Sequence, residues 1–462
     1  MDTLDLKEQR TEEEKRALHA GAARRLSPWY NGPAMITRIE VDGFKSLRNF
    51  ALDLEPFTVL IGPNSTGKSN VLDALALLSR LVSMPIVEAF KQGRGKNIHQ
   101  FSRHGTKVAD AIRFAVEFLE YGSYPREESF QSRFRYELTI ERRALRAGAE
   151  RLIARDERFL AMRPERDAWI AAHPELSRCA GYANAGDAIF TALKDKRSEL
   201  AIPPTHTALS HVNRVSTHMA VQNLQQCRVL DLGTAHLGEP SERTDSEGLA
   251  PDASNLPTIL AELPPSLLGE IRADLVSLVP GIASFDVTPE GDEIHLDFEL
   301  SGGERMPARL VSAGTLRILA LLTALRVRPR PYMLCVEEPE NGIYPGRLRA
   351  LLELLREATT RDHEEEVREE FEDSRREYNC EGIMTNQLPT QVILTTHSPV
   401  ALAPLRARPQ PLRFIDMVRR NGERVTRART VGKPGPGDHG QLTIAPREID
   451  RILQAVELEV PA

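Results

Sequence analysis

The sequence is poor in cysteine and in long apolar stretches. Its cysteines lie far apart and form no C-x-x-C pair, which excludes a disulfide framework and a cysteine-rich zinc site. There are only four of them: Cys179, Cys227, Cys335 and Cys380. The longest apolar stretches, 71–84 and 316–327, each contain an arginine and are shorter than the roughly 20 residues that cross a bilayer. We therefore expect a cytoplasmic protein without a membrane span.

An excess of charge of one sign is also missing, because 60 basic residues stand against 66 acidic ones and the net charge is −6. This balance argues against a uniformly basic surface for nucleic acid. The charge is nevertheless unevenly placed, with a net of −5 over 361–377 and of +6 over 406–429. The acidic segment predicts a solvated charged helix, with docking of a basic partner as the alternative. The basic segment suits nucleic-acid phosphates and solvated arginines equally well.

Patterning predicts one domain split by an insertion. Alternating stretches after residue 35 indicate short strands, and apolar residues at helical spacing over 70–83 indicate a helix. An arginine-rich stretch over 126–230 predicts helices, and a turn-rich linker follows it. Further on we expect a helix near 256–263, strands at 283–289 and 293–300, a helix at 315–326, a strand at 332–337, a helix at 346–357, a strand at 391–396 and a final hairpin. The predicted segments are a polar N-terminal extension (1–34), the first part of the domain (35–125), a helical insertion or arm with its linker (126–255), and the second part of the domain (256–462).

A phosphate-binding loop is the strongest motif. The stretch 62–69 fits G-x-x-x-x-G-K-[ST] and lies between an apolar strand and an amphipathic helix, the context that this motif requires. Its backbone N–H groups and the start of the helix favour phosphate oxygens. Lys68 would reach the terminal phosphates of ATP, and Ser69 would bind Mg²⁺. The predicted nucleotide-binding residues here are Gly62, Pro63, Asn64, Ser65, Thr66, Gly67, Lys68, Ser69 and Asn70.

Two further strand ends carry polar residues that suit phosphoryl transfer. The strand at 332–337 ends in Glu337 and Glu338. We expect the first carboxylate to hold Mg²⁺ and the second to orient or deprotonate the attacking water. The strand at 391–396 ends in His397, which could hydrogen-bond the γ-phosphate and that water. Glu338 and His397 are thus the predicted catalytic residues.

In this order, these motifs resemble the ABC-type ATPases of the SMC/RecF/OLD group, over about 36–125 and 255–430. The resemblance implies an α/β head of the P-loop NTPase class, with an N-terminal antiparallel lobe and a mixed or parallel core sheet flanked by helices. It also implies a homodimer in which a Ser-x-Gly signature of one chain meets the ATP of the other. LSGGE at 300–304 looks like the transporter-type signature, but Pro307 opposes an immediate helix, and we expect a hairpin turn. Ser312, Ala313 and Gly314 directly precede an apolar helix and are the predicted signature.

Within that group, GFKSL (43–47), SAGTLR (312–317), EEPENGIYP (337–345) and TTHSP (395–399) look most like stand-alone ATP-binding proteins related to OLD nucleases and to antiphage systems such as Septu and Gabija. Tyr344 stands where members often have histidine. The 65 residues after His397 contain no D-x-D cluster of the Toprim nuclease type. We therefore expect a separately encoded effector, nuclease or toxin-like, gated by ATP and Mg²⁺ in antiphage defence. A RecF-like repair ATPase that binds DNA directly is the alternative, and a transport ATPase is the least favoured interpretation.

Overall fold

The computed structural model of the chain describes residues 35–95, 97–122, 130–146, 149–173, 180–181, 188–192, 202–212, 215–233, 235–244, 248–327, 330–359, 390–402, 412–420, 422–432 and 443–458. The predicted N-terminal extension and the acidic segment 361–377 lie outside these ranges. No helix within them is both long and apolar enough to cross a membrane.

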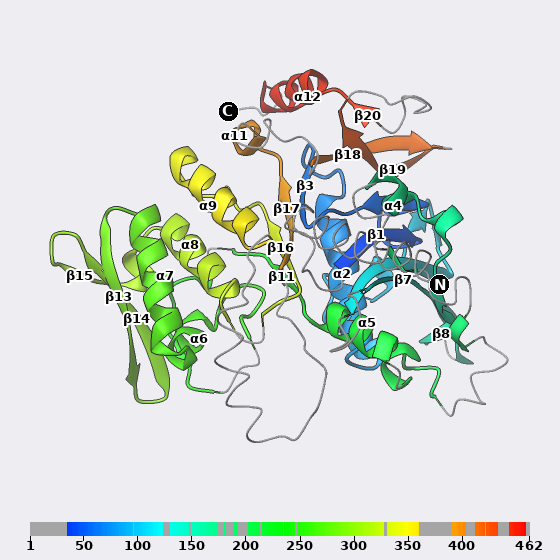
Figure 1. Cartoon of the computed structure of the whole chain (residues 1–462), viewed down its shortest axis with the longest axis horizontal. Helices are drawn as coiled ribbons and strands as arrows, with labels where there is room; N and C mark the ends of the chain where they lie inside the picture. Colours follow the sequence, from blue (N-terminus) through cyan, green and yellow to red (C-terminus); the bar gives the residue numbers. More distant parts are fainter. Residues whose placement is uncertain are drawn as a thin grey trace, which may run out of the picture.

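A mainly antiparallel sheet forms the N-terminal part (Figure 1). Its strand order is β10-β8-β7-β6-β1-β2, and β9 pairs with β7. Side chains alternate along its strands: in β7, Tyr136 and Leu138 are buried, whereas Arg135 and Glu137, which alternate with them, are half-buried. The strands are β1 (Met35–Asp42), β2 (Phe50–Asp53), β6 (Ala111–Gly122), β7 (Phe130–Ala144), β8 (Glu150–Ala161), β9 (Ala180–Gly181) and β10 (Ala188–Ala192).

The central sheet has the order β11-β16-β17-β3-β18-β19-β20. Its strands from β11 to β18 are parallel, and β19 runs antiparallel to β18. Every residue of β3 and β17 is buried, as expected of parallel strands covered on both faces. The strands are β3 (Phe57–Ile61), β11 (Cys227–Leu230), β16 (Met333–Glu337), β17 (Gln391–Thr396), β18 (Leu412–Arg420), β19 (Glu423–Val431) and β20 (Thr443–Ile444).

Helices cover both faces of the central sheet (Figure 1). On one face, Leu60, Cys335 and Ile393 pack with α2 and the N-terminal sheet. On the other, Val336 and Leu394 pack with α6, α7, α8 and α9. The helices are α2 (Lys68–Leu81), α3 (Ile86–Lys91), α4 (Ala168–Ala172), α5 (Val215–Gln225), α6 (Leu256–Glu262), α7 (Pro265–Leu278), α8 (Ala313–Ala324), α9 (Pro345–Glu357), α11 (Pro399–Leu402) and α12 (Pro446–Leu458). The expected α/β head, with its antiparallel lobe and largely parallel core sheet, is confirmed.

A third sheet projects beside α7 and α8 (Figure 1). It contains β12 (Ser241–Glu242), β13 (Ile282–Glu290), β14 (Glu293–Leu300) and β15 (Arg305–Pro307), and a separate two-stranded ribbon joins β4 (Arg103–His104) to β5 (Lys107–Val108). Strands β14 and β15 pair antiparallel, so residues 301–304 form the turn of a hairpin. The expectation that LSGGE is a hairpin turn, and not a helix start, is therefore confirmed.

The predicted helical insertion over 126–230 is wrong for most of its described residues. Strands β7 and β8 form a long hairpin that extends the N-terminal sheet, and β11 is an edge strand of the central sheet. The arginine, glutamate and alanine content suggested helices, but apolar residues recur at every second position, and cross-strand packing on one face then decides the structure. Helices α4 and α5 are the α-helices described in this stretch, and its described strands belong to the N-terminal and central sheets.

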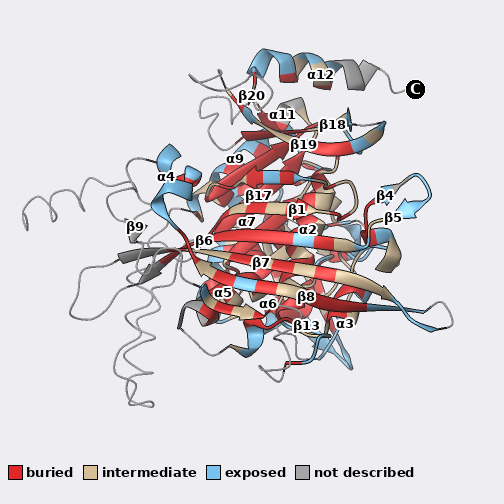
Figure 2. Cartoon of the chain, turned by 90° about the vertical axis from the view of Figure 1, so that its right-hand side faces the viewer, coloured by how far each residue is buried: buried red, intermediate tan, exposed pale blue. Residues whose placement is uncertain are grey.

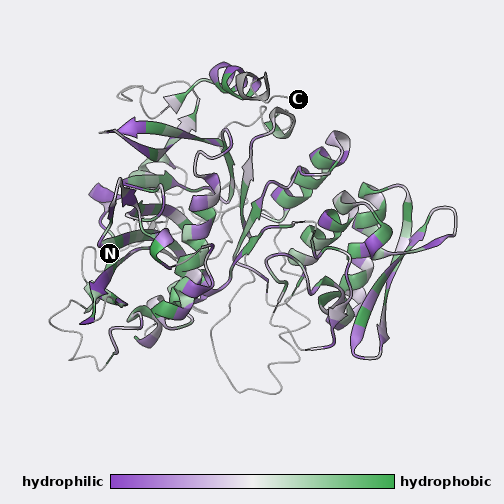
Figure 3. Cartoon of the chain, turned by 180° about the vertical axis from the view of Figure 1, so that it is seen from behind, coloured by the Kyte–Doolittle hydropathy of each residue, from purple (hydrophilic) through white to green (hydrophobic). Residues whose placement is uncertain are grey.

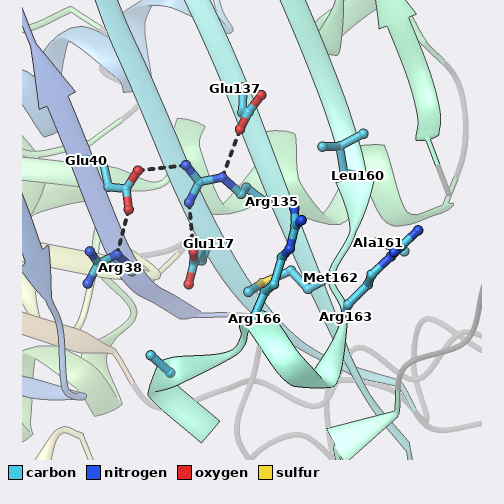
Figure 4. Close-up of a pocket in the computed structure, with 11 residues that line it drawn as sticks. Arg38, Glu40, Glu117, Arg135, Glu137, Leu160, Ala161, Met162, Arg163 and Arg166 are labelled. Carbon is cyan, nitrogen blue, oxygen red and sulfur yellow. Dashed lines mark hydrogen bonds and ion pairs between the residues drawn. The ribbon is translucent and has the colours of Figure 1, made fainter. Parts of the chain in front are cut away.

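Charged side chains line the face of the N-terminal sheet turned away from α2 (Figure 4). The Arg135 guanidinium donates to Glu40, Glu117 and Glu137 at 2.7, 2.8 and 3.0 Å. Arg38 also donates to Glu40, at 2.8 Å. These carboxylates line a cavity of about 650 Å³. Since each is already paired with arginine, this network joins neighbouring strands, and the cavity supplies no unpaired acidic group for a ligand. Figure 2 shows how much of the sheet beneath is buried.

Candidate functional site

The loop from Gly62 to Gly67 joins the buried end of β3 to α2, as its motif predicts. Lys68, the first residue of the helix, is 5% exposed. Its ammonium group donates to the carbonyl oxygens of Gly62 and Pro63 at 2.8 and 3.0 Å. Burial lowers the pKa of Lys68 from its usual value, although the nearby carboxylates Glu338, Glu340 and Glu337 oppose the shift. The loop thus curls around a buried cation.

Strand β19 supports the loop from the side. The Thr426 hydroxyl donates to the Thr66 carbonyl oxygen at 2.8 Å and lies 2.6 Å from the Ser46 hydroxyl. Asn70 in turn donates to Ser46 at 2.7 Å. Gly67 has φ +102°, and a Cβ there would lie 2.1 Å from the Thr426 hydroxyl, so both backbone and space require glycine. GFKSL, the loop and the final hairpin therefore form one packed unit.

The two predicted metal ligands lie together. The Ser69 hydroxyl donates to one carboxylate oxygen of Glu337, and Arg94 donates to the other. Burial would raise the pKa of Glu337, but the hydrogen bonds from Arg94 and Ser69 outweigh it and hold that pKa below its usual value. Glu337 is therefore an anion, and its oxygens and the Ser69 hydroxyl are hard ligands of the kind that Mg²⁺ prefers.

The two predicted catalytic residues are also in contact. His397 Nδ1 lies 2.9 Å from a carboxylate oxygen of Glu338. The other oxygen accepts a hydrogen bond of 3.0 Å from Asn341. Glu338 has φ +45°, a left-handed conformation that is strained for a residue with a side chain. Its N–H group donates to the carbonyl and hydroxyl oxygens of Thr395, at 3.1 and 3.2 Å, which holds that conformation.

A third carboxylate, Glu340, adjoins this pair. It accepts a hydrogen bond from the Thr396 hydroxyl and lies 4.0 Å from His397 Nδ1. Its other oxygen is buried without a hydrogen-bond partner among the described residues, and burial raises its pKa. The three acids of the EEPEN stretch thus differ: Glu337 faces Ser69, Glu338 faces His397, and Glu340 faces Thr396.

The predicted signature lies at the start of α8. The Ser312 side chain is exposed and caps the helix by accepting a hydrogen bond of 3.3 Å from the Thr315 N–H group. Gly314 packs so closely on the loop after β16 that a Cβ would meet the Gly342 carbonyl oxygen at 2.1 Å. Among the described residues, no recorded hydrogen bond or ion pair joins Ser312 or Gly314 to 62–70. Within one chain the signature is separate from the phosphate loop.

The residues present fit a nucleotide with Mg²⁺. Among the described residues, the Lys68 ammonium group donates to the loop carbonyls of Gly62 and Pro63, which it could exchange for phosphate oxygens. The loop lies at a helix N-terminus, where anions are favoured. Ser69 and Glu337 are the oxygen donors for a cation. The described residues contain no cluster of three or more His, Cys, Asp or Glu side chains placed to hold a metal. The remaining ligands would therefore come from phosphate oxygens and water, as is usual for Mg²⁺.

Comparisons with known proteins agree with this arrangement. Residues 254–403 match the family described as "AAA domain, putative AbiEii toxin, Type IV TA system", and residues 35–125 match "AAA ATPase domain". Both matched segments are AAA-type ATPase sequence. They include 62–69, 312–314, Glu337, Glu338 and His397, and they indicate an AAA-type ATPase.

The chain is also similar to SMC proteins, over a short segment of sequence in one case and at low identity in the others. Over 100 residues it is 36% identical to the chromosome partition protein Smc of Aquifex aeolicus. The matched segment is 21% of this chain and only 8% of that relative's length. An SMC head bound to the C-winged helix domain of ScpA shares 14% identity and a TM-score of 0.43, with 86% of this chain and 98% of that one covered. The SMC head domain from Thermotoga maritima shares 15% identity and a TM-score of 0.37, with 86% and 99% covered.

Several site residues could not be singled out from the sequence. Arg94 stands in a glycine-flanked loop, and Asp231 follows β11, a strand in a stretch that we expected to be helical. Thr426 lies on a strand noted only for its arginines. The EEPEN motif contains Glu340, but nothing in its spacing distinguishes it from the two acids before it. The one usable signal is the stretch CRVL before Asp231, whose cysteine, valine and leucine suit a short strand.

Proposed function

We propose that this protein hydrolyses ATP in two composite sites formed between two copies of the chain. The observation that carries the proposal is the meeting of Lys68, Ser69, Glu337 and Glu338 at one edge of the central sheet. Glu338 would accept the proton of the attacking water, and His397 would hold that carboxylate in position. Bound Mg²⁺ would neutralise phosphate charge. Ser69 and Glu337 would hold it.

The signature supports a partner chain as the second half of each site. Ser312 is exposed at a helix N-terminus, the place where a phosphate is favoured, yet it makes no recorded bond to its own phosphate loop. Leu310 and Tyr344 are 66% and 72% exposed, so both side chains are available for contact with a partner chain. We infer that Ser312 to Gly314 of one copy close the site of the other and that ATP favours the closed pair.

Mixing two inactive variants tests this arrangement. Lys68→Ala removes the phosphate contact, and Ser312→Asp keeps the helix cap but places a negative charge where a phosphate would lie. Each variant alone should lose ATP turnover. A 1:1 mixture should recover about a quarter of the wild-type rate, because about half of the pairs are mixed and each mixed pair contains one intact site of two. No recovery, with both variants folded and pairing, would contradict the shared site.

The biological setting that we favour is a regulatory ATPase of a bacterial antiphage system in the cytoplasm. Its nucleotide state would gate a separately encoded nuclease or toxin-like effector, and this chain alone would cut no nucleic acid. The family description of residues 254–403 names a toxin–antitoxin system, which supports this setting. Purification from the native source should yield a stable complex with an effector that ATP or its removal releases. A chain that cleaves DNA or RNA by itself would overturn this part.

A specific surface supports a second candidate, a repair ATPase that binds DNA directly. Arg419, Arg420 and Arg424 are exposed at the free end of the β18–β19 hairpin, which Figure 3 colours as hydrophilic. Most other arginines of the basic segment are neutralised where the structure describes them: Arg413 pairs with Glu55 at 3.0 Å, and Arg427 and Arg429 each pair with Asp416 at 2.8 Å.

Removing positive charge from this hairpin would distinguish the DNA-binding repair ATPase from the regulatory ATPase. Replacing Arg419, Arg420 and Arg424 with glutamine should abolish stimulation of the ATPase by DNA if the second candidate holds. A control with the same change in charge replaces Arg143, Arg146 and Arg151 at the end of the β7–β8 hairpin. If DNA does not stimulate the wild-type ATPase at all, or if both triple variants lose the stimulation equally, direct binding through this hairpin is excluded.

A further inference from the structure

Arg94 lies beside Glu337, one of the two predicted metal ligands of the site. It belongs to the loop after α3, and its guanidinium reaches the carboxyl edge of the central sheet, where β11 and β16 end side by side. Leu230 of β11 is the register partner of Val336 of β16, so Asp231 and Glu337 are adjacent at that edge. Arg94 Nη2 donates to both carboxylates, Asp231 at 3.1 Å and Glu337.

These contacts leave Glu337 without a free oxygen. One carboxylate oxygen accepts from Ser69 and the other from Arg94. Asp73 of α2 lies 3.5 Å from Arg94 Nε and adds a third negative charge. Asp73 is also paired with Lys45, so Glu337 and Asp231 are the carboxylates that depend on Arg94. The Arg94 guanidinium binds the same carboxylate oxygens that a divalent cation would bind. The two positive groups therefore cannot occupy this position together.

The ion pair can also open without loss of packing. The Glu337 side chain is 14% exposed, but those of Arg94 and Asp231 are 45% and 58% exposed. Arg94 therefore reaches inwards from the solvent, and its withdrawal would uncover Glu337 while leaving the core of the domain intact. Solvent also screens the pair, so a cation can compete with it.

We propose that Arg94 takes the place of the divalent cation in the nucleotide-free protein, pairing with Glu337 and Asp231, and leaves when Mg²⁺ arrives with the nucleotide. The proposal rests on Ser69 and Glu337 being the metal ligands of the proposed ATPase. It makes Arg94 a positioning residue that keeps Glu337 and Ser69 in place and restrains cation binding until phosphate oxygens complete the ligand set. Asp231 would then be a further carboxylate near the proposed metal ligands, at the edge of the central sheet where β11 and β16 end.

The test measures Mn²⁺ binding without nucleotide, by electron paramagnetic resonance of the free ion. Arg94→Gln removes the competing charge, and we expect it to bind one Mn²⁺ at least about tenfold more tightly than the wild type. Adding Glu337→Gln to that variant should abolish the gain, which would place the ion at this edge. Lys91→Gln is the control, because Lys91 is an exposed cation of the same region that pairs only with Glu88 among the recorded contacts.

Equal Mn²⁺ affinity of Arg94→Gln and wild type would overturn the proposal, and so would an equal gain in Lys91→Gln. Arg94→Lys guards against a folding defect, since lysine keeps the charge and should stay close to the wild type. Weaker binding of ATP without metal in Arg94→Gln would also contradict it, because Arg94 would then be a phosphate ligand. Wild-type ATP binding and turnover test the proposed ATPase separately, so either hypothesis can fail alone.

Discussion

His397 and Glu338 are joined by a 2.9 Å contact between the imidazole Nδ1 and a carboxylate oxygen, although 59 residues separate them in the chain. Strands β16 and β17 are neighbours in the central sheet and run parallel, so their carboxyl ends lie together. The left-handed backbone of Glu338, held by Thr395, turns its side chain toward the histidine. The group that we assign as the base is therefore oriented before substrate binds.

Replacing this base should separate binding from turnover. In Glu338→Gln the amide can still accept a hydrogen bond but cannot take a proton from water, and we expect kcat to fall by roughly 10²- to 10⁴-fold. The dissociation constant for ATP should change by less than about threefold. Single-turnover kinetics and fluorescent-nucleotide titration measure the two. Glu353→Gln, an exposed change on α9, is the control, and unchanged turnover in Glu338→Gln would refute the assignment.

Thr426 should affect nucleotide affinity through the phosphate loop. Thr426→Val keeps the shape of the side chain but removes the hydroxyl that bonds to the Thr66 carbonyl oxygen and to Ser46. Loss of such a bond costs about 0.5–1.5 kcal/mol, so we expect ATP affinity to fall roughly 3- to 10-fold. Thr426→Ser should restore it. Thr430→Val, an exposed change on the same strand, should leave affinity unchanged, and an equal effect there would contradict the specific role.

The buried ion pair of Arg133 and Asp167 should matter for stability. Arg133 donates to both Asp167 oxygens, at 2.6 and 3.0 Å, and both side chains are fully buried. Asp167→Asn removes the nearest counter-charge of the buried Arg133, while Glu117 remains 3.7 Å away, and should cost up to about 3–5 kcal/mol of unfolding free energy. Asp53→Asn is the control, because its pair with Arg38 is partly exposed and should cost at most about 1 kcal/mol. Denaturant unfolding measures both, and equal losses would refute the distinction.

Glu120 should make stability depend on pH. Burial raises its pKa well above the usual value, and one of its oxygens has no hydrogen-bond partner among the described residues. The folded protein therefore keeps a proton that the unfolded chain releases above about pH 4.3. Its contribution to stability is complete below that pH and is lost as pH rises through the folded-state pKa.

Glu120→Gln cannot ionise and should remove this dependence. We expect the variant to be more stable than the wild type at pH 8 and equal to it near pH 4, because it has no carboxyl group that must ionise in the buried site as the pH rises. Urea unfolding at several pH values measures the difference. The exposed Glu165→Gln is the control. A gain independent of pH would show that packing, and not ionisation, is responsible.

Much of the second half of the domain could be predicted because its patterns are local. The apolar stretches of β3, β16 and β17 and the spacing in α8 each identify an element without knowledge of its neighbours. The long helix α7 was missed, although Pro265 opens it in a position that favours a helix start. The sequence predicts helices for the hairpin of β7 and β8, because its arginines and glutamates favour a helix locally. The strand structure is stabilised instead by packing against neighbouring strands, which the local sequence does not reveal.

The sequence by itself determined the candidate phosphate loop, since the whole pattern lies within one continuous stretch, 62–69, between a strand and a helix. It also determined which strand ends carry acids and a histidine. Only the tertiary structure decided that Glu338 faces His397, that Thr426 supports the loop and that Arg94 joins Glu337 to Asp231. These pairings depend on the order of strands in the sheet and on the angle at which loops leave it. Both are fixed by packing between segments hundreds of residues apart, which no local pattern encodes.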